Sequence, residues 1–169
     1  MRLDLTRYRQ PTTPFARTFA PDEVAQEGEA YRIVAPVDLR MDVHKDKHRF
    51  RLVGTARTEL ELDCGRCLEP FRERFEASFD QRYVPAESGL AGEREVPEED
   101  LDTSVYRDDG IDLDEVLREQ LYLALPMKPL CREDCAGLCP LCGTNLNAGT
   151  CGCTTAWEDP RLAPLKGLS

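Results

Sequence analysis

Residues 49–84 read RFRLVGTARTELELDCGRCLEPFRERFEASFDQRYV, and this stretch decides the fold. Apolar and polar residues alternate from Arg49 to Asp63, and the alternation resumes from Phe71 to Val84. A period of two residues predicts strands with one apolar face each. The segment between them, Cys64-Gly-Arg-Cys67-Leu-Glu-Pro70, contains the turn. We therefore predict a β-hairpin with two cysteines at its tip.

The charges on the polar face predict the register of this hairpin. The apolar face comprises Phe50, Leu52, Gly54, Ala56, Leu60 and Leu62, then Phe71, Phe75, Ala77, Phe79 and Tyr83, with Glu73 as an exception. If Leu62 lies opposite Phe71, three outward pairs follow: Glu61–Arg72, Glu59–Arg74 and Arg57–Glu76. Each pair contributes only a few tenths of a kcal/mol. Their agreement in sign nevertheless supports this register.

Further elements extend the hairpin to a fold class. Residues 37–43 alternate strictly and predict another strand, followed by a polar turn at residues 44–48. Residues 111–126 predict a helix with an apolar stripe, and its start, Asp112-Leu-Asp-Glu115, resembles a capping box. The predicted class is α+β: an antiparallel β-meander packed by one helix, with a C-terminal Cys-rich zinc-binding module.

Composition divides the chain into five parts. These are an N-terminal segment (1–29), the sheet with its CxxC hairpin (30–84), an acidic linker (85–110), the helix (111–126), and the zinc module with its tail (127–169). The net charge is −10, and residues 85–120 hold 13 acidic residues against three basic ones. The acidity belongs to one segment, so it neither supports nor excludes a nucleic-acid partner.

Eight cysteines carry the strongest chemical signal. After Cys64 and Cys67 come Cys131-x3-Cys135-x3-Cys139-x2-Cys142-x8-Cys151-x-Cys153. Tetrahedral zinc takes four thiolates, so this count predicts two structural zinc ions. Disulfides, a redox CxxC and buried thiols are the alternatives. We expect a reducing cytoplasm because the first residues, MRLDLTR, lack the apolar region of a secretory signal, and no apolar run is long enough to span a membrane.

The spacing leaves the pairing of the cysteines open. Cys139, Cys142, Cys151 and Cys153 form a compact quartet, which leaves Cys131 and Cys135 to join Cys64 and Cys67. A swapped assignment is possible because Cys151-Gly-Cys153 is a tight spacing for one ion. Gly143 follows Cys142 and allows a positive φ, which lets backbone N–H groups turn toward the sulfurs. His44 and His48 are expected to be turn residues, because cysteines already complete two sites.

The polar face of the sheet has two interpretations. Many of its arginines face carboxylates, as an ordinary solvated sheet requires. The less committed candidates for contact with RNA or protein are Arg40, Arg49, Arg51, Arg66 and Arg82. Catalysis is not expected, because the sequence contains no Gly-rich phosphate loop and no nucleophile elbow. Four thiolates per zinc also leave no open position, so we expect neither an enzyme nor a small-molecule substrate.

Several motifs together carry a family resemblance. They are Cys64-Gly-Arg-Cys67-Leu68, Ile111-Asp-Leu113, Leu123-Ala-Leu-Pro126, the segment from Cys135 to Asn147, and Asp159-Pro-Arg-Leu-Ala-Pro-Leu-Lys166. In this order they resemble the YceD family of large ribosomal RNA subunit accumulation proteins. The resemblance implies a non-enzymatic factor needed for the accumulation of large-subunit ribosomal RNA. Our hypothesis is that it binds large-subunit rRNA or a large-subunit ribosomal protein; the acidic segment motivates the second option, because ribosomal proteins are basic.

Two other functions compete with this interpretation. The first is a thiol or zinc redox sensor, because sulfur ligands released from zinc become reactive. The second is a regulatory DNA-binding zinc ribbon. Its weakness is that no basic helix follows a cysteine knuckle in the sequence.

Overall fold

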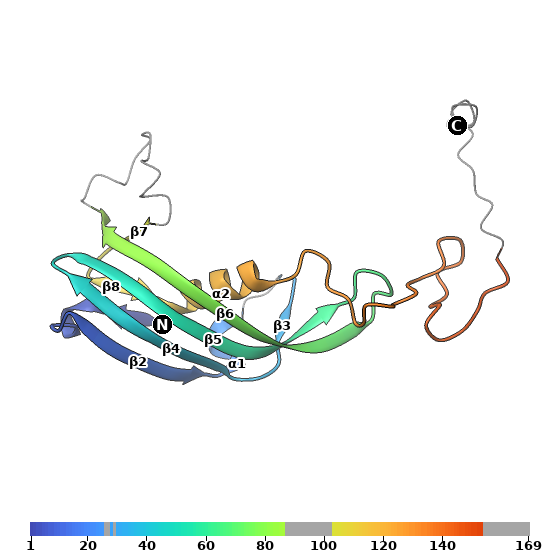
Figure 1. The fold of residues 1–169 in the computed structure, drawn as a ribbon, viewed down its shortest axis with the longest axis horizontal. Helices are drawn as coiled ribbons and strands as arrows, with labels where there is room; N and C mark the ends of the chain where they lie inside the picture. The colour runs from blue at the N-terminus through green and yellow to red at the C-terminus, as the bar shows by residue number, and fades with distance from the viewer. Residues whose placement is uncertain (26–27, 29, 87–102, 154–169) are drawn as a thin grey trace, which may run out of the picture. The chain divides into compact units, whose positions relative to one another are not determined.

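A six-stranded sheet forms the largest part of the fold in this computed structural model, which describes residues 1–25, 28, 30–86 and 103–153. Its strands follow the order β2-β4-β5-β6-β7, and β3 also pairs with β5 (Figure 1). The bounds are β2 Thr12–Phe19, β3 Arg32–Ile33, β4 Val37–Asp46, β5 Arg49–Asp63, β6 Pro70–Pro85 and β7 Thr103–Tyr106. A two-stranded sheet pairs β1 (Arg2–Asp4) with β8 (Gly110–Asp112).

The predicted apolar face of the hairpin forms the core. Phe50, Leu52, Ala56, Leu60 and Leu62 of β5 are buried, as are Ala77, Phe79 and Tyr83 of β6. Phe71 and Phe75 lie nearer the tip and are only partly buried. Glu73, the exception in the pattern, is exposed. It needs no buried partner because the hydrophobic cover thins toward this end of β6.

Two ion pairs confirm the predicted register of β5 and β6. The guanidinium of Arg57 lies 2.8 Å from the carboxylate of Glu76, and that of Arg72 lies 3.2 Å from Glu61. Glu61 also accepts an ion pair from Arg32 of β3, at 3.1 Å. These pairs lie on the exposed face, so each contributes little to stability. Their positions agree with the register predicted from the alternation of charge.

The helix α2 spans Leu113–Ala124 and packs its apolar stripe on the sheet. Leu113, Val116, Leu117 and Leu121 belong to the same buried cluster as the strand residues. The predicted capping box does not form at the start of α2, because the side chain of Asp112 makes no cap hydrogen bond. It accepts instead from the N-terminal amine of Met1, at 3.0 Å. The helix therefore begins beside the residue that precedes β1, and this residue supplies the charge partner.

The fold departs from a simple meander in two places. The sequence analysis assigned no strand to residues 1–29, yet β2 pairs antiparallel with β4 along its whole length. Strand β7 pairs parallel to β6, with Arg82 opposite Thr103. The sheet is therefore rich in antiparallel pairs but not wholly antiparallel. Most of the proposed acidic linker, residues 87–102, lies outside the described residues, while its ends contribute to β6, β7 and β8.

The chain divides into two units. The first comprises residues 1–62 and 71–127 and contains both sheets and α2. The second comprises residues 63–70 and 128–169, so the tip of the β5–β6 hairpin belongs with the cysteine-rich segment. Short helical turns occur at η1 (Leu5–Arg7) and α1 (Pro21–Val24). Among the described residues, no helix has the length and apolar character needed to cross a membrane.

Candidate metal centre

All eight cysteines belong to the second unit and gather in two groups of four. The hairpin cluster comprises Cys64, Cys67, Cys131 and Cys135, and the tail cluster comprises Cys139, Cys142, Cys151 and Cys153. Within each cluster the Sγ atoms lie within 4.8 Å of one another. This grouping is the compact-quartet pairing considered from the sequence, and the swapped assignment is not the one observed.

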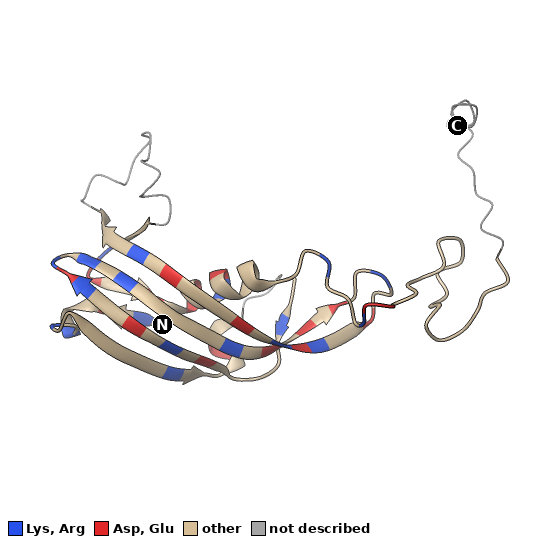
Figure 2. Cartoon of the chain, viewed as in Figure 1, with Lys and Arg blue, Asp and Glu red and all other residues tan. Residues whose placement is uncertain are grey.

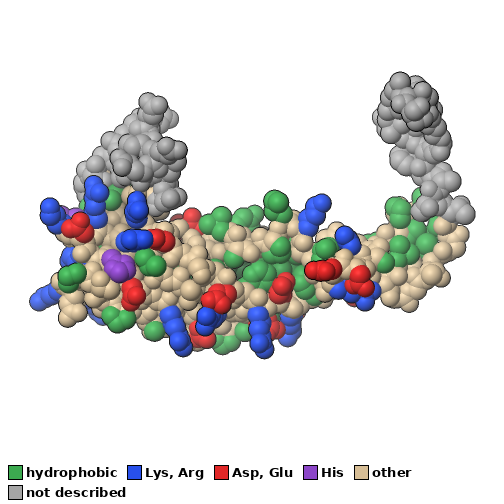
Figure 3. Space-filling model, viewed as in Figure 1, with side chains coloured by type: hydrophobic (Ala, Val, Ile, Leu, Met, Phe, Trp, Pro, Cys, Tyr) green, Lys and Arg blue, Asp and Glu red, His purple; other side chains and the backbone are tan. Residues whose placement is uncertain are grey.

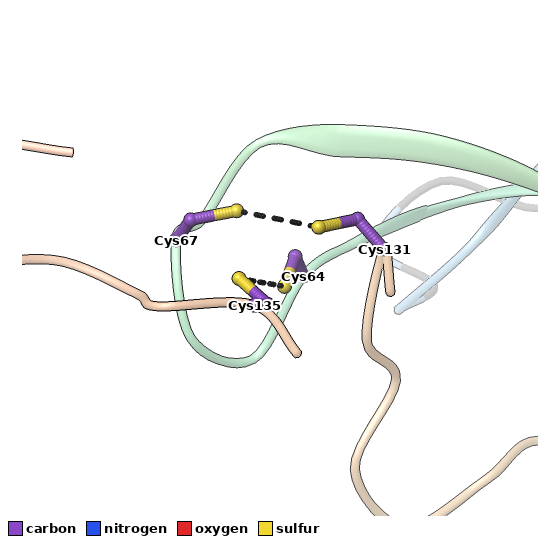
Figure 4. Close-up of side chains that lie close together, drawn as sticks. All are labelled: Cys64, Cys67, Cys131 and Cys135. Carbon is purple, nitrogen blue, oxygen red and sulfur yellow. Dashed lines mark hydrogen bonds between the residues drawn. The ribbon is translucent and has the colours of Figure 1, made fainter. Parts of the chain in front are cut away.

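The sulfur spacing in the hairpin cluster fits a tetrahedral ion. The Sγ atoms of Cys64 and Cys135 are 3.8 Å apart, and those of Cys67 and Cys131 are also 3.8 Å apart (Figure 4). A tetrahedron with Zn–S bonds of about 2.3 Å has edges of about 3.8 Å. A disulfide needs sulfurs about 2.05 Å apart, and all eight cysteines are free. The donor set and its spacing therefore fit a divalent ion that prefers sulfur.

Backbone hydrogen bonds hold the hairpin tip in a tight turn. The N–H of Leu68 donates to the carbonyl of Cys64 at 2.9 Å, and the N–H of Cys64 donates to the carbonyl of Glu69 at 3.0 Å. The N–H of Gly65 reaches the carbonyl of Pro129 at 2.8 Å. The last bond joins the tip to the segment that carries Cys131. The turn thereby brings together cysteines more than 60 residues apart in the sequence.

Arg66 has a structural role within the second unit. Its guanidinium donates to the carbonyls of Cys135 at 2.9 Å and Glu133 at 3.2 Å. Its own carbonyl accepts from the N–H of Leu138 at 3.1 Å. Gly137 passes close by with φ +75°, and a Cβ there would lie 3.1 Å from the Arg66 carbonyl oxygen. The sequence analysis named Arg66 as a candidate for partner contact; it is exposed, and these bonds also join it to the cysteine segment.

The tail cluster is built on a second tight turn, at Cys139-Pro-Leu-Cys142-Gly143. Gly143 has φ +72°, as its place after the second cysteine predicts. Its N–H donates to the Cys139 carbonyl at 2.9 Å, and the N–H of Cys139 donates to the Thr144 carbonyl at 2.8 Å. The Thr144 hydroxyl lies 3.2 Å from the Cys142 sulfur. The turn requires a left-handed backbone conformation at residue 143, which glycine adopts without steric cost.

Asn145 and Asn147 are functional residues that sequence reasoning missed. The Asn147 amide donates to the Cys135 sulfur at 3.3 Å and accepts from the backbone N–H of Ala136 at 2.8 Å. Asn145 donates to the Glu69 carboxylate at 3.0 Å, which ties the loop to the hairpin tip. The signal was the Asn-Leu-Asn run inside the cysteine spacing. Asparagine side chains orient metal ligands by hydrogen bonding to them or to their backbone.

The thiol pKa values split within each cluster. Hydrogen bonds from backbone N–H groups, chiefly that of Cys131, lower the pKa of Cys64 to about 6. A hydrogen bond with the Thr144 hydroxyl is the main cause that lowers the pKa of Cys142 to about 6. Partial burial of its sulfur raises the pKa of Cys131 to about 12, and a hydrogen bond with Cys142 raises that of Cys153 to about 12. Four crowded sulfurs cannot all ionise without a cation, so this split is typical of a site that needs positive charge.

The other candidate contact residues lie on the sheet. Arg51 forms a bidentate ion pair with Asp80, and Arg40, Arg49 and Arg82 are exposed. Figure 2 shows both basic and acidic residues along these strands. The side chain of His44 contacts the Thr12 hydroxyl at 3.0 Å, and the carbonyl of His48 accepts from the Tyr106 hydroxyl at 2.9 Å. Neither histidine belongs to a cysteine cluster.

Comparison with known proteins identifies relatives of the chain. The family model described as large ribosomal RNA subunit accumulation protein YceD matches residues 52–169. An uncharacterised protein of Mycobacterium tuberculosis is 32% identical over 98% of this chain and 79% of its own length. The chloroplastic "Large ribosomal RNA subunit accumulation protein YCED homolog 1" of Zea mays is 28% identical over 79% of this chain and 53% of its own. The Arabidopsis thaliana protein of the same name is 27% identical, over 86% and 52%. No solved structure matches the chain.

Proposed function

Because the chain belongs to the YceD family, we propose that it is a non-enzymatic, zinc-stabilised factor that supports the accumulation of large-subunit ribosomal RNA. The observation that carries this proposal is the family match over residues 52–169, joined by plant relatives whose printed name is large ribosomal RNA subunit accumulation protein. Its partner is the large-subunit rRNA or a large-subunit ribosomal protein. It works in the cytoplasm.

The cysteine clusters support a structural role for the metal in this proposal. Each cluster offers four sulfur ligands, which fill the coordination shell of a tetrahedral ion. A catalytic zinc needs an open position for water or substrate. Bound zinc would supply attraction between thiolates that otherwise repel one another. The ion would thus hold the second unit together and would not act on a substrate.

Depletion of the protein in its own cells tests the proposal. We expect the large subunit and its rRNA to fall relative to the small subunit, measured by sucrose-gradient profiles and rRNA quantification. Re-expression of the wild-type chain should restore the ratio. An unchanged ratio of subunits after complete depletion would contradict the proposed function. Elemental analysis of the purified chain should separately find about two zinc ions, as expected for four thiolates per ion.

The exposure of the tail cluster favours a second candidate function, a thiol or zinc redox sensor. Cys142 and Cys153 are exposed, whereas only Cys139 of this cluster is buried. Oxidation selects accessible thiolates, and an oxidised sulfur no longer holds zinc. A sensor would therefore release zinc from the tail cluster under mild oxidant, with a change in partner binding. This candidate is tested below by the order of metal release.

A further inference from the structure

A cleft of about 760 Å³ lies in the first unit, where β4 turns into β5. It is lined by the end of β4, the turn and the start of β5 (His44 to Arg51), by the last residues of β6 (Arg82 to Pro85), and by Thr103, the first residue of β7. Figure 3 shows Lys, Arg and His side chains gathered at the end of the molecule to the left of the view. The cleft is separate from the cysteine clusters, because all eight cysteines belong to the second unit.

The lining of the cleft is mostly cationic. Five of its lining residues are Lys or Arg and one is Asp, whereas the chain's net charge of −10 comes from residues 85–120. The cationic residues are Lys45, Lys47, Arg49, Arg51 and Arg82. A concave surface lined by one sign of charge concentrates its field and attracts ions of the opposite sign. The cleft is therefore suited to an anionic ligand.

These cationic side chains differ in how available they are to bind an anion. Lys45 donates to the carbonyl of Tyr8 at 2.8 Å and lies 5.5 Å from the centre of the Phe50 ring. Arg51 is paired with Asp80. Lys47 and Arg49 are exposed at the tight turn, where Lys47 has φ +56°. The turn thus contributes two exposed cations, Lys47 and Arg49, to the lining of the cleft.

We propose that this cleft binds the sugar–phosphate backbone of RNA. The choice of RNA rests on the proposed function and on charge, since ribosomal proteins are basic and a basic cleft repels them. The aromatic rings lining the cleft, Phe50 and Tyr83, are both buried and offer no face on which a base could stack. Contacts to phosphate, without stacking, position an RNA strand but do not select its sequence. Binding is therefore sequence-independent and sensitive to salt.

The test uses the full-length chain and a fluorescent 20-nucleotide single-stranded RNA of mixed sequence, with anisotropy measured from 50 to 200 mM KCl. The test variant is Lys47→Gln/Arg49→Gln, which removes both exposed cations of the turn. Two control variants accompany it. Lys47→Arg/Arg49→Lys keeps the charge, and Arg74→Gln removes an exposed arginine from β6 of the same sheet, outside the cleft. Circular dichroism and zinc content verify that each variant is folded.

Each phosphate contact contributes about 0.7 to the slope of log K against log salt for a single strand. The double Gln variant should therefore bind more weakly with a slope shallower by about 1.4, so its loss of affinity relative to the wild type should be about 7-fold larger at 50 mM than at 200 mM KCl. Both controls should match the wild-type chain. The proposal is overturned if the wild-type chain does not bind the RNA, or if the double variant binds as well as the wild type.

A complementation experiment separates failure of the cleft from failure of the proposed function. Depleted cells receive either the wild-type chain or the Lys47→Gln/Arg49→Gln variant, and subunit ratios are measured. If the wild-type chain restores the ratio and the variant does not, the cleft is used in the cell. If both restore it equally, the cleft proposal fails while the proposed function stands. If depletion itself leaves the ratio unchanged, the proposed function fails, and the anisotropy data still decide whether the cleft binds RNA.

Discussion

Each of the two cysteine clusters offers four thiol ligands, but the clusters differ in how far apart these ligands lie in the sequence. In the hairpin cluster, Cys64 and Cys135 are separated by 71 positions and Cys67 and Cys131 by 64, and three of the four cysteines are buried. The tail cluster takes its ligands from residues 139–153, and one of its four is buried. The first is a long-range cross-link and the second is a local loop. A metal in each would therefore have different consequences for stability and reactivity.

Chain entropy alone accounts for little of this difference. Closing a loop of about 68 residues restricts the unfolded chain by about 4 kcal/mol, against about 3 kcal/mol for a loop of 12 residues, by the relation used for disulfides. Burial and hydrogen bonding separate the clusters further. The hairpin cluster is surrounded by bonds from Gly65, Arg66 and Asn147, whereas the tail cluster faces solvent at Cys142 and Cys153. The hairpin cluster should therefore dominate stability.

Loss of the hairpin cluster should have the largest effect. Cys64→Ser should reduce the zinc content from two ions to one and destabilise the second unit by several kcal/mol, a share of the roughly 10–16 kcal/mol of a structural site. Hydrogen exchange should then open the amides of Gly65 and Leu138, which bond to Pro129 and Arg66. The matched control Cys142→Ser should also lose one ion but leave both amides protected. Equal exchange in the two variants would show that the clusters do not differ in this way.

Metal should leave the tail cluster first. A chromogenic chelator, or mild peroxide followed by the chelator, should release zinc in two phases, because exposed thiolates are attacked before buried ones. The fast phase should vanish in Cys142→Ser and persist in Cys64→Ser. This result would favour the redox-sensor candidate if partner binding changed with the fast phase. Release of both ions only as the protein unfolds would exclude that candidate.

Acid should release metal from both clusters, and metal binding should release protons. Without metal, Cys64 and Cys142 have pKa values lowered to about 6, so they are mostly thiolates at pH 7. As the pH falls through 6 they become protonated and can no longer bind zinc without losing a proton. Cys131 and Cys153, raised to about 12, are thiols at pH 7 and must lose their protons to bind zinc. Zinc added to the metal-free chain in weak buffer at pH 7 should acidify the solution, with at least one proton per cluster. No acidification would contradict thiolate ligation.

Loss of the Arg66 guanidinium should cost about 1–3 kcal/mol, because the carbonyls of Glu133 and Cys135 lose a charged donor. Arg66→Gln should lower the unfolding temperature of the second unit and speed zinc release from the hairpin cluster. The control Arg74→Gln changes an exposed arginine of β6 in the first unit and should have no such effect. If Arg66→Gln instead leaves stability unchanged and weakens the binding of a partner, the sequence-based interpretation of Arg66 as a contact residue is correct.

The sequence predicted the elements whose signal is local. Alternation gave β4, β5 and β6, and the charge pairs Glu61–Arg72 and Arg57–Glu76 aligned the hairpin. The grouping of the tail cluster, four cysteines within 15 residues, was one of the assignments that the sequence left open. The helix α2 followed from its apolar stripe. In each case the residues that interact are close in sequence or repeat with a fixed period.

The features that were missed depend on distant partners. Strand β2 contains Pro14 and is half exposed, so its sequence carries a weak strand pattern, and its pairing with β4 supplies what the pattern lacks. Strands β1 and β8 are three residues each and exist because they pair with each other. Arg66 is exposed, and no local pattern reveals that it also donates to the carbonyls of Glu133 and Cys135.

The smallest effect concerns the residue after the second cysteine of each turn. Leu68 has φ +60° and Gly143 has φ +72°, so both turns need a left-handed residue and only one uses glycine. Leu68→Gly removes a conformational cost of about 1–2 kcal/mol. The larger chain entropy of glycine and the lost contacts of a side chain that is 65% exposed offset most of this gain, which leaves a stabilisation of about 0.5 kcal/mol. Gly143→Ala should cost about 1 kcal/mol from strain alone, since a Cβ there meets no atom within 4 Å. Urea unfolding and zinc affinity measure both changes. Clear destabilisation by Leu68→Gly would instead show that the leucine side chain stabilises the hairpin turn through its own contacts.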